Sequence, residues 1–368
     1  MTDSHNRFSA ILVVTNSCNL HCKYCYEYKK DSSDMSLDTA LDIVEKEMNN
    51  HPGVDISFDI FGGEPLLRFD FIKRLCETVW DKYAPHDIKF SCITNGTLVD
   101  EFVIKWLQQH NRHFFCHISL DGTPEMHKLN RGETFPLNAA KKFAEIWPNR
   151  ATAKMTISKE TVSSTYEGIR YLGSLGLRVA PSLARGVEWD NDDLSVYKSE
   201  LKKVLDYYCS DFSISNLDLF KNSLTPVLLP QMQEKYCGAG YSLCAYSPQG
   251  IKYPCQMFLP ISLDSDRWNA RSDKDVRGGT TFYYDQDCIN CPIRNLCARC
   301  PGVNFKERAE FGARDKRLCE FLKAEFALMA EYIISRCLAI PADKLSKKDY
   351  YELKAAVELN KLLGRVAT

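Results

Sequence analysis

The first two hundred residues alternate short apolar runs with longer amphipathic segments. This alternation is typical of βα units that build a parallel sheet, because each strand is followed by a helix that covers it. The predicted strands are Ala10–Thr15, Val54–Phe61, Ile88–Thr94, Phe114–Leu120, Ala153–Ser158 and Leu177–Leu183. The helices that follow are predicted to begin near Ser36, Phe69, Asp100, Pro136, Ser164 and Leu194, with Ser36 and Asp100 as N-caps. The sequence therefore predicts an α/β fold with six βα pairs.

The second predicted strand alternates apolar and polar residues. Apolar side chains at 54, 56, 58 and 60 are interleaved with Asp55, Ser57 and Asp59. A parallel strand covered on both faces is apolar throughout. The polar face favours either a barrel with a hydrated interior or an edge strand with one face in solvent, and this strand alone does not decide between them.

The pattern changes after the sixth βα pair. Periodicity weakens between Ser210 and Lys235, and from Cys237 the residues Cys, Gly and Pro become frequent. Cys319–Leu338 and Asp343–Val366 then show the apolar spacing of amphipathic helices. We expect a division into residues 1–209, a bridging segment 210–236, a cysteine-rich unit 237–325 and C-terminal helices over 326–368.

Composition and charge narrow the class of protein. The chain has 368 residues, 45% of them hydrophobic, and a formal net charge of −1, so no charge excess favours nucleic acid or an anionic membrane. Residues 1–14 have no basic targeting segment, and no apolar stretch is long enough to span a bilayer. We therefore expect a cytoplasmic protein. Sixteen cysteines in a reducing compartment indicate metal or cluster ligation more than disulfides.

Three cysteines follow the first predicted strand. Cys18, Cys22 and Cys25 form a CxxxCxxC triplet in the run TNSCNLHCKYCYEY. Thiolates bind iron–sulfur clusters or zinc, and three of them leave one coordination position open where a closed site uses four. The alternative is three buried cysteines without a ligand, because free cysteine is often buried.

Other candidate residues follow neighbouring strands. Gly62-Gly63-Glu64-Pro65 comes after the second strand, Thr94-Asn95-Gly96 after the third and Ser119-Leu120-Asp121-Gly122 after the fourth. Loops at the carboxyl ends of parallel strands meet at one rim, where reactive groups collect. The two glycines suit a backbone that approaches a ligand closely, although a plain turn would have the same composition.

The triplet resembles the signature of the radical S-adenosylmethionine (radical SAM) enzymes, CxxxCxφC with an aromatic residue φ, here Tyr24. The resemblance implies a partial (β/α)6 TIM-type barrel over residues 1–209. It also implies a [4Fe–4S] cluster whose open iron chelates S-adenosylmethionine, and an electron transfer that yields methionine and a 5′-deoxyadenosyl radical. That radical then abstracts hydrogen from the substrate.

The same resemblance assigns contacts to S-adenosylmethionine. Gly62, Gly63 and Glu64 match the motif that binds its amino group. Ser119 and Arg131 match contacts to its ribose and carboxylate, for which a guanidinium is well suited. Tyr24 is expected to contact adenine, the alternative being that it only covers the cluster. We expect Asp121 and His127 to order their loop.

A second group of eight cysteines lies between positions 237 and 319. They include a Gly-x4-Cys element ending at Cys255 and a CxxCx5CxxC run from Cys288 to Cys300. Taken alone, that run also suits a zinc site. The group resembles the SPASM extension of radical SAM enzymes, a small cysteine-rich domain with two auxiliary [4Fe–4S] clusters. We assign residues 237–325 to it.

The resemblance implies a ligand set for each auxiliary cluster. The first would be held by Cys237, Cys244, Cys255 and Cys300, and the second by Cys288, Cys291, Cys297 and Cys319. The usual spacing before the Cys300 position is one residue longer, since only Ala298 and Arg299 follow Cys297 here. The remaining cysteines are expected in the core, namely Cys76, Cys92, Cys116, Cys209 and Cys337.

The resemblance favours an enzyme that modifies peptides. Anaerobic sulfatase maturases are similar in length and use an Asp directly after the Gly-x4-Cys cysteine as a base, but this chain has Gln256 there. An amide cannot accept that proton. The leading hypothesis is maturation of a ribosomal peptide by crosslinking or a related change, with formylglycine formation on Cys or Ser as the alternative. A small-molecule substrate and a non-enzymatic iron–sulfur or zinc protein are further alternatives.

Several partners follow from this hypothesis. The expected cofactors are three [4Fe–4S] clusters and S-adenosylmethionine. The expected partners are a precursor peptide or protein and a reductant such as flavodoxin or ferredoxin, with a separate leader-binding protein as a further candidate. The catalytic base is not assigned by the sequence.

Overall fold

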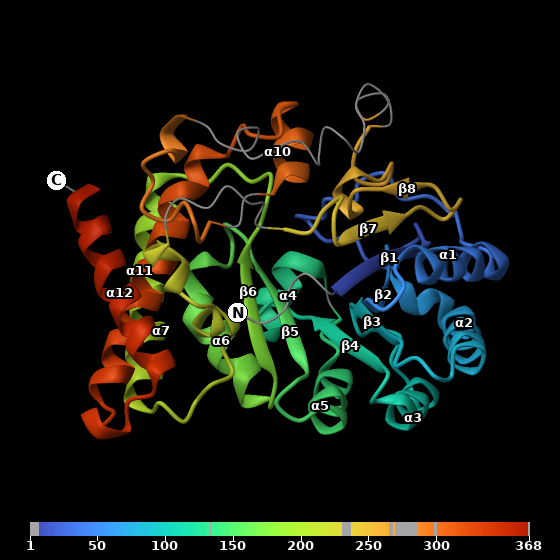
Figure 1. Cartoon of the computed structure of the whole chain (residues 1–368), viewed down its shortest axis with the longest axis horizontal. Coiled ribbons are helices and arrows are strands. Elements are labelled where there is room, and N and C mark those ends of the chain that lie inside the picture. Colours follow the sequence, from blue (N-terminus) through green and yellow to red (C-terminus); the bar gives the residue numbers. More distant parts are fainter. Residues whose placement is uncertain are drawn as a thin grey trace.

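A parallel β-sheet organises the computed structural model (Figure 1). The structure describes residues 7–132, 134–229, 237–264, 268, 286–297 and 300–366. The strands are β1 (Arg7–Thr15), β2 (Asp55–Gly62), β3 (Lys89–Thr94), β4 (Phe114–Ser119), β5 (Thr152–Ile157), β6 (Arg178–Leu183), β7 (Leu243–Tyr246) and β8 (Lys252–Tyr253). Their order in the sheet is β6-β5-β4-β3-β2-β1-β7-β8, and only the β7–β8 pair is antiparallel. The six predicted strands and the α/β fold class are confirmed.

Helices follow the strands in the expected βα order. They are α1 (Leu37–Asn50), α2 (Phe69–Lys82), α3 (Glu101–His110), α4 (Pro124–Arg131), α5 (Leu137–Ile146), α6 (Thr165–Ser174), α7 (Asn191–Ser210), α10 (Pro301–Arg308), α11 (Lys316–Leu338) and α12 (Lys347–Val366). Short 3₁₀ helices span Pro65–Arg68, Val162–Ser164, Asp218–Lys221, Thr225–Leu228, Gln256–Phe258, Gln286–Cys288 and Ala342–Lys344. The side chains of Ser36 and Asp100 accept hydrogen bonds from the amides of Thr39 and Val103, so both predicted N-caps are confirmed.

Two helices of the barrel differ from the sequence prediction. The last helix of the barrel begins at Asn191 rather than near Leu194, because Asp190 and Asp193 form a reciprocal capping box one turn earlier. The helix α4 was not predicted. Its N-cap is Thr123, whose hydroxyl accepts a hydrogen bond from the Met126 amide, and it ends at Arg131.

The polar face of β2 lies inside the curved sheet. The strand pairs with β1 on one side and β3 on the other, so the edge-strand interpretation is wrong. Asp59 accepts hydrogen bonds from the hydroxyls of Ser9 on β1 and Ser91 on β3. These bonds satisfy the polar side chains within the barrel, as buried polar groups require.

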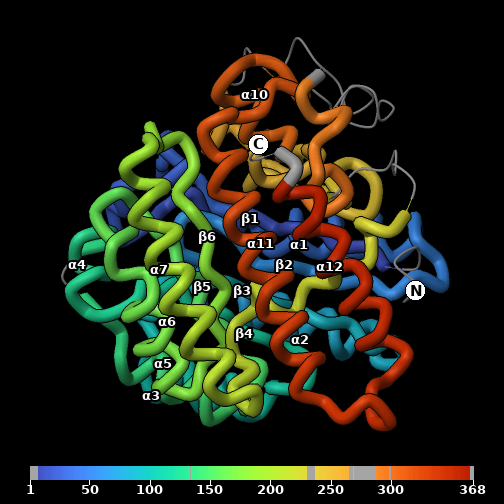
Figure 2. Tube along the Cα trace, turned by 90° about the vertical axis from the view of Figure 1, so that its left-hand side faces the viewer, coloured from blue at the N-terminus to red at the C-terminus, as the bar shows by residue number. Residues whose placement is uncertain are grey.

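The C-terminal segments pack on both sides of the barrel. Strand β7 pairs in parallel with β1 and extends the sheet beyond the six βα units. Helices α7, α11 and α12 lie side by side along the opposite, β6, side (Figures 1 and 2). The two C-terminal helices are confirmed, with starts at Lys316 and Lys347. No helix among the described residues combines the length and apolar character needed to cross a membrane.

Candidate active site

A cavity of about 320 Å³ opens at the carboxyl ends of the barrel strands. It brings together residues that the sequence analysis took from four separate loops. The predicted site residues that line it are Cys18, Cys22, Tyr24, Cys25, Gly62, Gly63, Glu64, Ser119 and Arg131. The cavity therefore contains the whole expected set for the first cluster and for S-adenosylmethionine.

The three cysteines of the triplet lie on one loop after β1. All three side chains are partly exposed to the cavity, and the Cys25 amide donates to the Cys22 carbonyl at 3.1 Å. Burial raises the pKa of the Cys18 and Cys22 thiols, and Arg131 opposes this shift at Cys22. Among the described residues no three His, Cys, Asp or Glu side chains converge as they would around a single metal ion. In a [4Fe–4S] cluster each thiolate binds its own iron, so this donor set suits a cluster better than one ion.

Gly62 and Gly63 join the end of β2 to the cysteine loop. The Gly63 amide donates to the Thr15 carbonyl at 3.1 Å, and the Glu64 amide donates to the Ser17 carbonyl at 2.9 Å. A Cβ on Gly62 or Gly63 would lie 2.1 or 2.3 Å from those same carbonyl oxygens. The two glycines are therefore required by close packing against the cysteine loop, in addition to any approach to a ligand.

Glu64 is buried beneath the cavity, and its carboxylate accepts three hydrogen bonds. One oxygen accepts from the Leu66 amide at 3.0 Å and the Thr94 hydroxyl at 2.7 Å, and the other accepts from the Asn95 amide at 2.7 Å. Burial raises the pKa of Glu64, and these hydrogen bonds oppose the shift. Glu64 thus connects the loops after β2 and β3, which fixes the floor of the cavity.

Arg131 is held by a buried ion pair at the end of α4. Its Nε and Nη2 donate to the two carboxylate oxygens of Asp121 at 2.9 and 3.2 Å. Asp121 also accepts from the Tyr24 hydroxyl, the Asn130 amide and the Thr156 backbone amide. The predicted role of Asp121 in ordering its loop is confirmed, and the structure adds a specific role, which is to orient Arg131.

Tyr24 packs against the same arginine. Its ring centroid lies 5.4 Å from the guanidinium carbon of Arg131, within the range of a cation–π contact. The Nη1 group of Arg131 is 3.9 Å from the Cys22 sulfur. The aromatic residue of the triplet therefore links the cysteine loop to Arg131.

Three of the four cysteines expected at the first auxiliary cluster lie on the same face of the sheet extension. Cys255 belongs to the apolar cluster around Phe258, and Cys237 and Cys300 pack against that cluster. Burial raises the pKa of Cys300, with a contribution from Cys237.

Cys244 does not join these three. It lies on β7 beside Ala10 and belongs to the core on the α1 side, together with Tyr246. Its strand neighbour Ala245 faces the Cys255 cluster. Since successive side chains of a strand point to opposite faces, the structure separates Cys244 from Cys237, Cys255 and Cys300.

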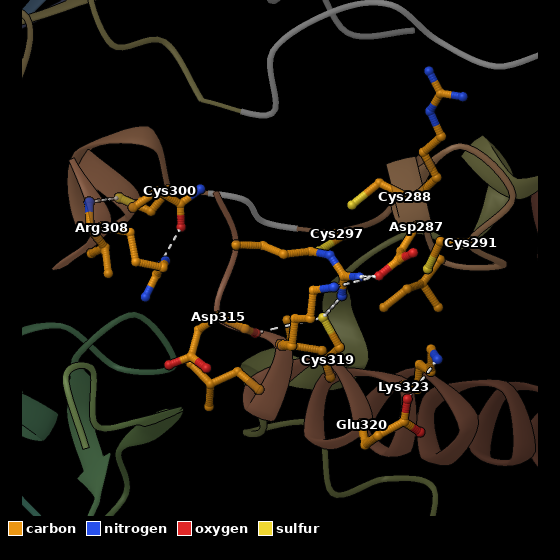
Figure 3. Close-up of a pocket in the computed structure, with 18 of the residues that line it drawn as sticks. Asp287, Cys288, Cys291, Cys297, Cys300, Arg308, Asp315, Cys319, Glu320 and Lys323 are labelled. Carbon is orange, nitrogen blue, oxygen red and sulfur yellow. Dashed lines mark hydrogen bonds and ion pairs between the residues drawn. The ribbon is translucent and has the colours of Figure 1, made fainter. Parts of the chain in front are cut away.

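The second set of cysteines lines another cavity, of about 420 Å³ (Figure 3). Arg314 also lines this cavity, and it donates to the Cys319 sulfur at 2.6 Å and to Asp287 at 2.7 Å. Figure 3 shows Cys300 to the side of the other four cysteines, Cys288, Cys291, Cys297 and Cys319. The residues of the shortened gap, Ala298 and Arg299, lie outside the described residues.

Gln256 occupies the position of the base expected in sulfatase maturases. It begins the short helix Gln256–Phe258, and its Oε1 is buried without a hydrogen-bond partner among the described residues. It is not among the residues that line the cavity of the cysteine triplet.

Several residues that line the cavity were not selected from the sequence, and two of them are basic groups on the β5–β6 side. Lys154 on β5 and Arg185 after β6 both line the cavity of the cysteine triplet. A lysine within a short strand and an arginine in a loop have no distinctive spacing, so only the fold brings them to the site.

Comparison with known proteins identifies the first part of the chain. A model of the Radical SAM superfamily matches residues 12–183, which include the cysteine triplet and all six strands of the barrel except the start of β1. The chain therefore contains a radical SAM domain, and the resemblance drawn from the cysteine spacing is confirmed.

Relatives match over most of the chain at lower identity. A cysteine-type anaerobic sulfatase-maturating enzyme of Clostridium perfringens is 25% identical, covering 77% of this chain and 85% of that protein. The radical SAM cyclopropyl synthase TigE of Paramaledivibacter caminithermalis is 23% identical, and the match covers 85% of this chain and 71% of TigE. An uncharacterized protein of Methanocaldococcus jannaschii is 36% identical over 112 residues, but these cover only 38% of its length and 30% of this chain.

Solved structures share the fold. Histidine-tagged anSMEcpe with bound AdoMet superposes with a TM-score of 0.70 at 21% identity, covering 94% of this chain and 98% of that one. Streptococcus suis SuiB bound to precursor peptide SuiA superposes with a TM-score of 0.60 at 20% identity, covering 84% of this chain and 75% of SuiB.

Proposed function

We propose that this protein is a radical SAM enzyme that modifies a side chain of a ribosomally made peptide. The observation that carries the proposal is the single cavity that contains Cys18, Cys22 and Cys25 together with Glu64 and Arg131. A [4Fe–4S] cluster on the three thiolates would supply the electron that cleaves S-adenosylmethionine.

The chain's own residues would hold and orient the cosubstrate. The backbone at Gly62 and Gly63 and the carboxylate of Glu64 would accept its amino group. Arg131, fixed by Asp121, would bind its carboxylate, and Ser119 would hydrogen-bond its ribose. Tyr24, whose ring packs on Arg131, would contact the adenine of the cosubstrate.

The cysteine-rich region would hold two auxiliary [4Fe–4S] clusters in a SPASM domain over residues 237–325, after the barrel of residues 1–209 and the bridge of 210–236. Cys288, Cys291, Cys297 and Cys319 would bind the second, because they lie together in one cavity, with Cys300 to their side (Figure 3). Cys237, Cys255 and Cys300 would bind the first. A flavodoxin or ferredoxin in the cytoplasm would deliver electrons, and a leader-binding protein is a further candidate partner.

Formylglycine formation on a sulfatase is the second candidate function. It is favoured by the sulfatase-maturating relative, whereas TigE favours peptide maturation, so the comparisons support both. Gln256 supports peptide maturation, because its amide has no basic site for the proton that the sulfatase reaction releases.

The proposal is tested by anaerobic reconstitution with iron, sulfide and S-adenosylmethionine. With a strong reductant the protein should form 5′-deoxyadenosine. The Cys22→Ala variant should form none, while Cys209→Ala, which changes a cysteine on α7, should behave as the parent. Cleavage by Cys22→Ala at the parent rate would refute the site. Oxidation of a sulfatase-derived peptide by the unmodified protein would favour the second candidate.

A further inference from the structure

Most of the charged groups around the cavity already have partners. Arg131 is paired with Asp121, and Glu64 accepts three hydrogen bonds. Lys30 donates to the Leu20 carbonyl within the cysteine loop at 3.2 Å. These groups lie on or beside the loops that follow β1, β2 and β4, which is the side we assign to the cluster and to S-adenosylmethionine.

Lys154 enters the cavity from the other side of the barrel. It lies on β5, directly opposite Ser119 on β4 and Ala180 on β6. Its strand neighbours Ala153 and Met155 are fully buried in the core behind the sheet, so Lys154 faces the interior of the barrel. The small residues on both flanking strands leave room for its long side chain at the cavity wall.

The Lys154 ammonium has no hydrogen bond or ion pair among the described residues. Asp218 is the carboxylate that attracts it most, but Asp218 already accepts from Nε and Nη2 of Arg178 at 2.9 and 2.6 Å. Burial lowers the pKa of Lys154, and the positive charge of Arg178 adds to that effect. His117 offers no countercharge, because burial lowers its pKa to about 4 and keeps it neutral.

Arg185 places a second positive charge at the same side of the site. It follows β6 and lines both the triplet cavity and the cavity of the second cysteine set. Its side chain is exposed, and Glu325 and Cys300 attract it electrostatically, but no hydrogen bond or ion pair connects it to another described residue. The β5–β6 wall of the cavity therefore carries two cations without bound anions.

We propose that Lys154, with Arg185 at the rim, binds a carboxylate of the peptide substrate and so selects peptides that have an acidic residue next to the modified one. This inference rests on the proposed function. A partly buried cation without a partner loses solvation that nothing in the protein restores, and a substrate carboxylate would restore it through a charge-assisted hydrogen bond. It would also orient the peptide towards the cysteine triplet, since both line one cavity.

The test uses the anaerobically reconstituted full chain with S-adenosylmethionine. Two pools of short synthetic peptides, acetylated and amidated at their ends, are otherwise identical but have Glu or Gln at a fixed central position and no other acidic residue. Retained peptide is quantified by mass spectrometry after equilibrium dialysis. The parent should retain the Glu pool about tenfold better than the Gln pool, as one charge-assisted contact allows. Lys154→Met should lose this preference, and Lys154→Arg should keep most of it.

Controls separate this inference from its alternatives. Lys105→Met, which changes an exposed lysine on α3, should keep the preference. Binding of labelled S-adenosylmethionine should be the same in the parent and in Lys154→Met. Weaker binding of S-adenosylmethionine with an unchanged peptide preference would assign Lys154 to the cosubstrate carboxylate and overturn the proposal. Equal retention of both pools, including retention of neither, would also overturn it. A parent that makes no 5′-deoxyadenosine would instead refute the proposed function.

Discussion

Asp121 connects several residues of the cavity wall. Its carboxylate is fully buried and orients Arg131, Tyr24 and the backbone at Thr156 at once. We expect Asp121→Asn to weaken binding of S-adenosylmethionine by at least about tenfold, because an amide cannot pair with both nitrogen atoms of the guanidinium. Loss of one partner of a buried ion pair should also cost about 3–5 kcal/mol of stability.

Calorimetric titration with S-adenosylmethionine and denaturant unfolding measure the two effects of Asp121→Asn. Asp206→Asn is the matched control, since Asp206 forms an exposed ion pair with Lys202 on α7. Unchanged binding of the cosubstrate by Asp121→Asn would show that the orientation of Arg131 is not needed.

The folded protein should lose stability at low pH because His127 is buried in its neutral form. It is buried under the edge of the Phe135 ring, and burial, with repulsion from Arg131, lowers its pKa to about 4. Between about pH 6.5 and 4 the unfolded chain binds a proton that the folded chain does not, so stability falls as pH falls through this window. At pH 5 the loss from this group should be about 2 kcal/mol relative to pH 7.

Urea unfolding at pH 7 and pH 5 measures this loss. The His127→Gln variant should be less stable at pH 7 but should show a smaller change between the two pH values. An equal change in the parent and the variant would place the pH dependence in other groups.

At the residue scale, the sequence predicted which residues gather at the site and missed how they are connected. The cysteine spacing and the glycines are local patterns, and they could be recognised directly. The pairing of Arg131 with Asp121 spans ten residues without a fixed motif. Lys154 and Arg185 reach the cavity only through strand pairing, so no local pattern indicated them.

At the scale of elements, a buried glutamate joins the first helix to the extension of the sheet. Glu47 on α1 is fully buried and accepts hydrogen bonds from Lys252 on β8, at 2.7 Å, and from the Tyr246 hydroxyl on β7. We expect Glu47→Gln to destabilise the protein by about 1–3 kcal/mol, because the neutral amide leaves Lys252 without its countercharge. Glu45→Gln is the matched control on the same helix, since its ion pair with Lys82 is exposed and should contribute little.

Thermal unfolding of the two glutamine variants compares these contributions. Equal melting temperatures would show that the contact between α1 and the β7–β8 hairpin does not stabilise the fold.

The six barrel strands were predictable because each is an apolar run followed by an amphipathic helix. Strands β7 and β8 were not, since four and two residues are too few for a periodic pattern.

At the scale of the whole molecule, the sheet extension determines which cysteines can act together. Three clusters would give about twelve irons per chain. Because Cys244 and Cys255 lie on opposite sides of the β7–β8 layer, their loss should have different consequences. Cys255→Ala should lower the iron content by about four, whereas Cys244→Ala should leave it at about twelve with an unchanged electron paramagnetic resonance spectrum of the reduced protein.

The first auxiliary site would then have three cysteine ligands and one iron free for another ligand, as at the N-terminal triplet. No other cysteine is available for that position, because the remaining ones lie in the barrel core, on α7 and α11, or in the two other sets. A loss of four irons in Cys244→Ala would show instead that β7 turns this side chain towards Cys255 when the cluster is assembled. Iron analysis of both variants therefore tests whether the proposed clusters include one open iron or two.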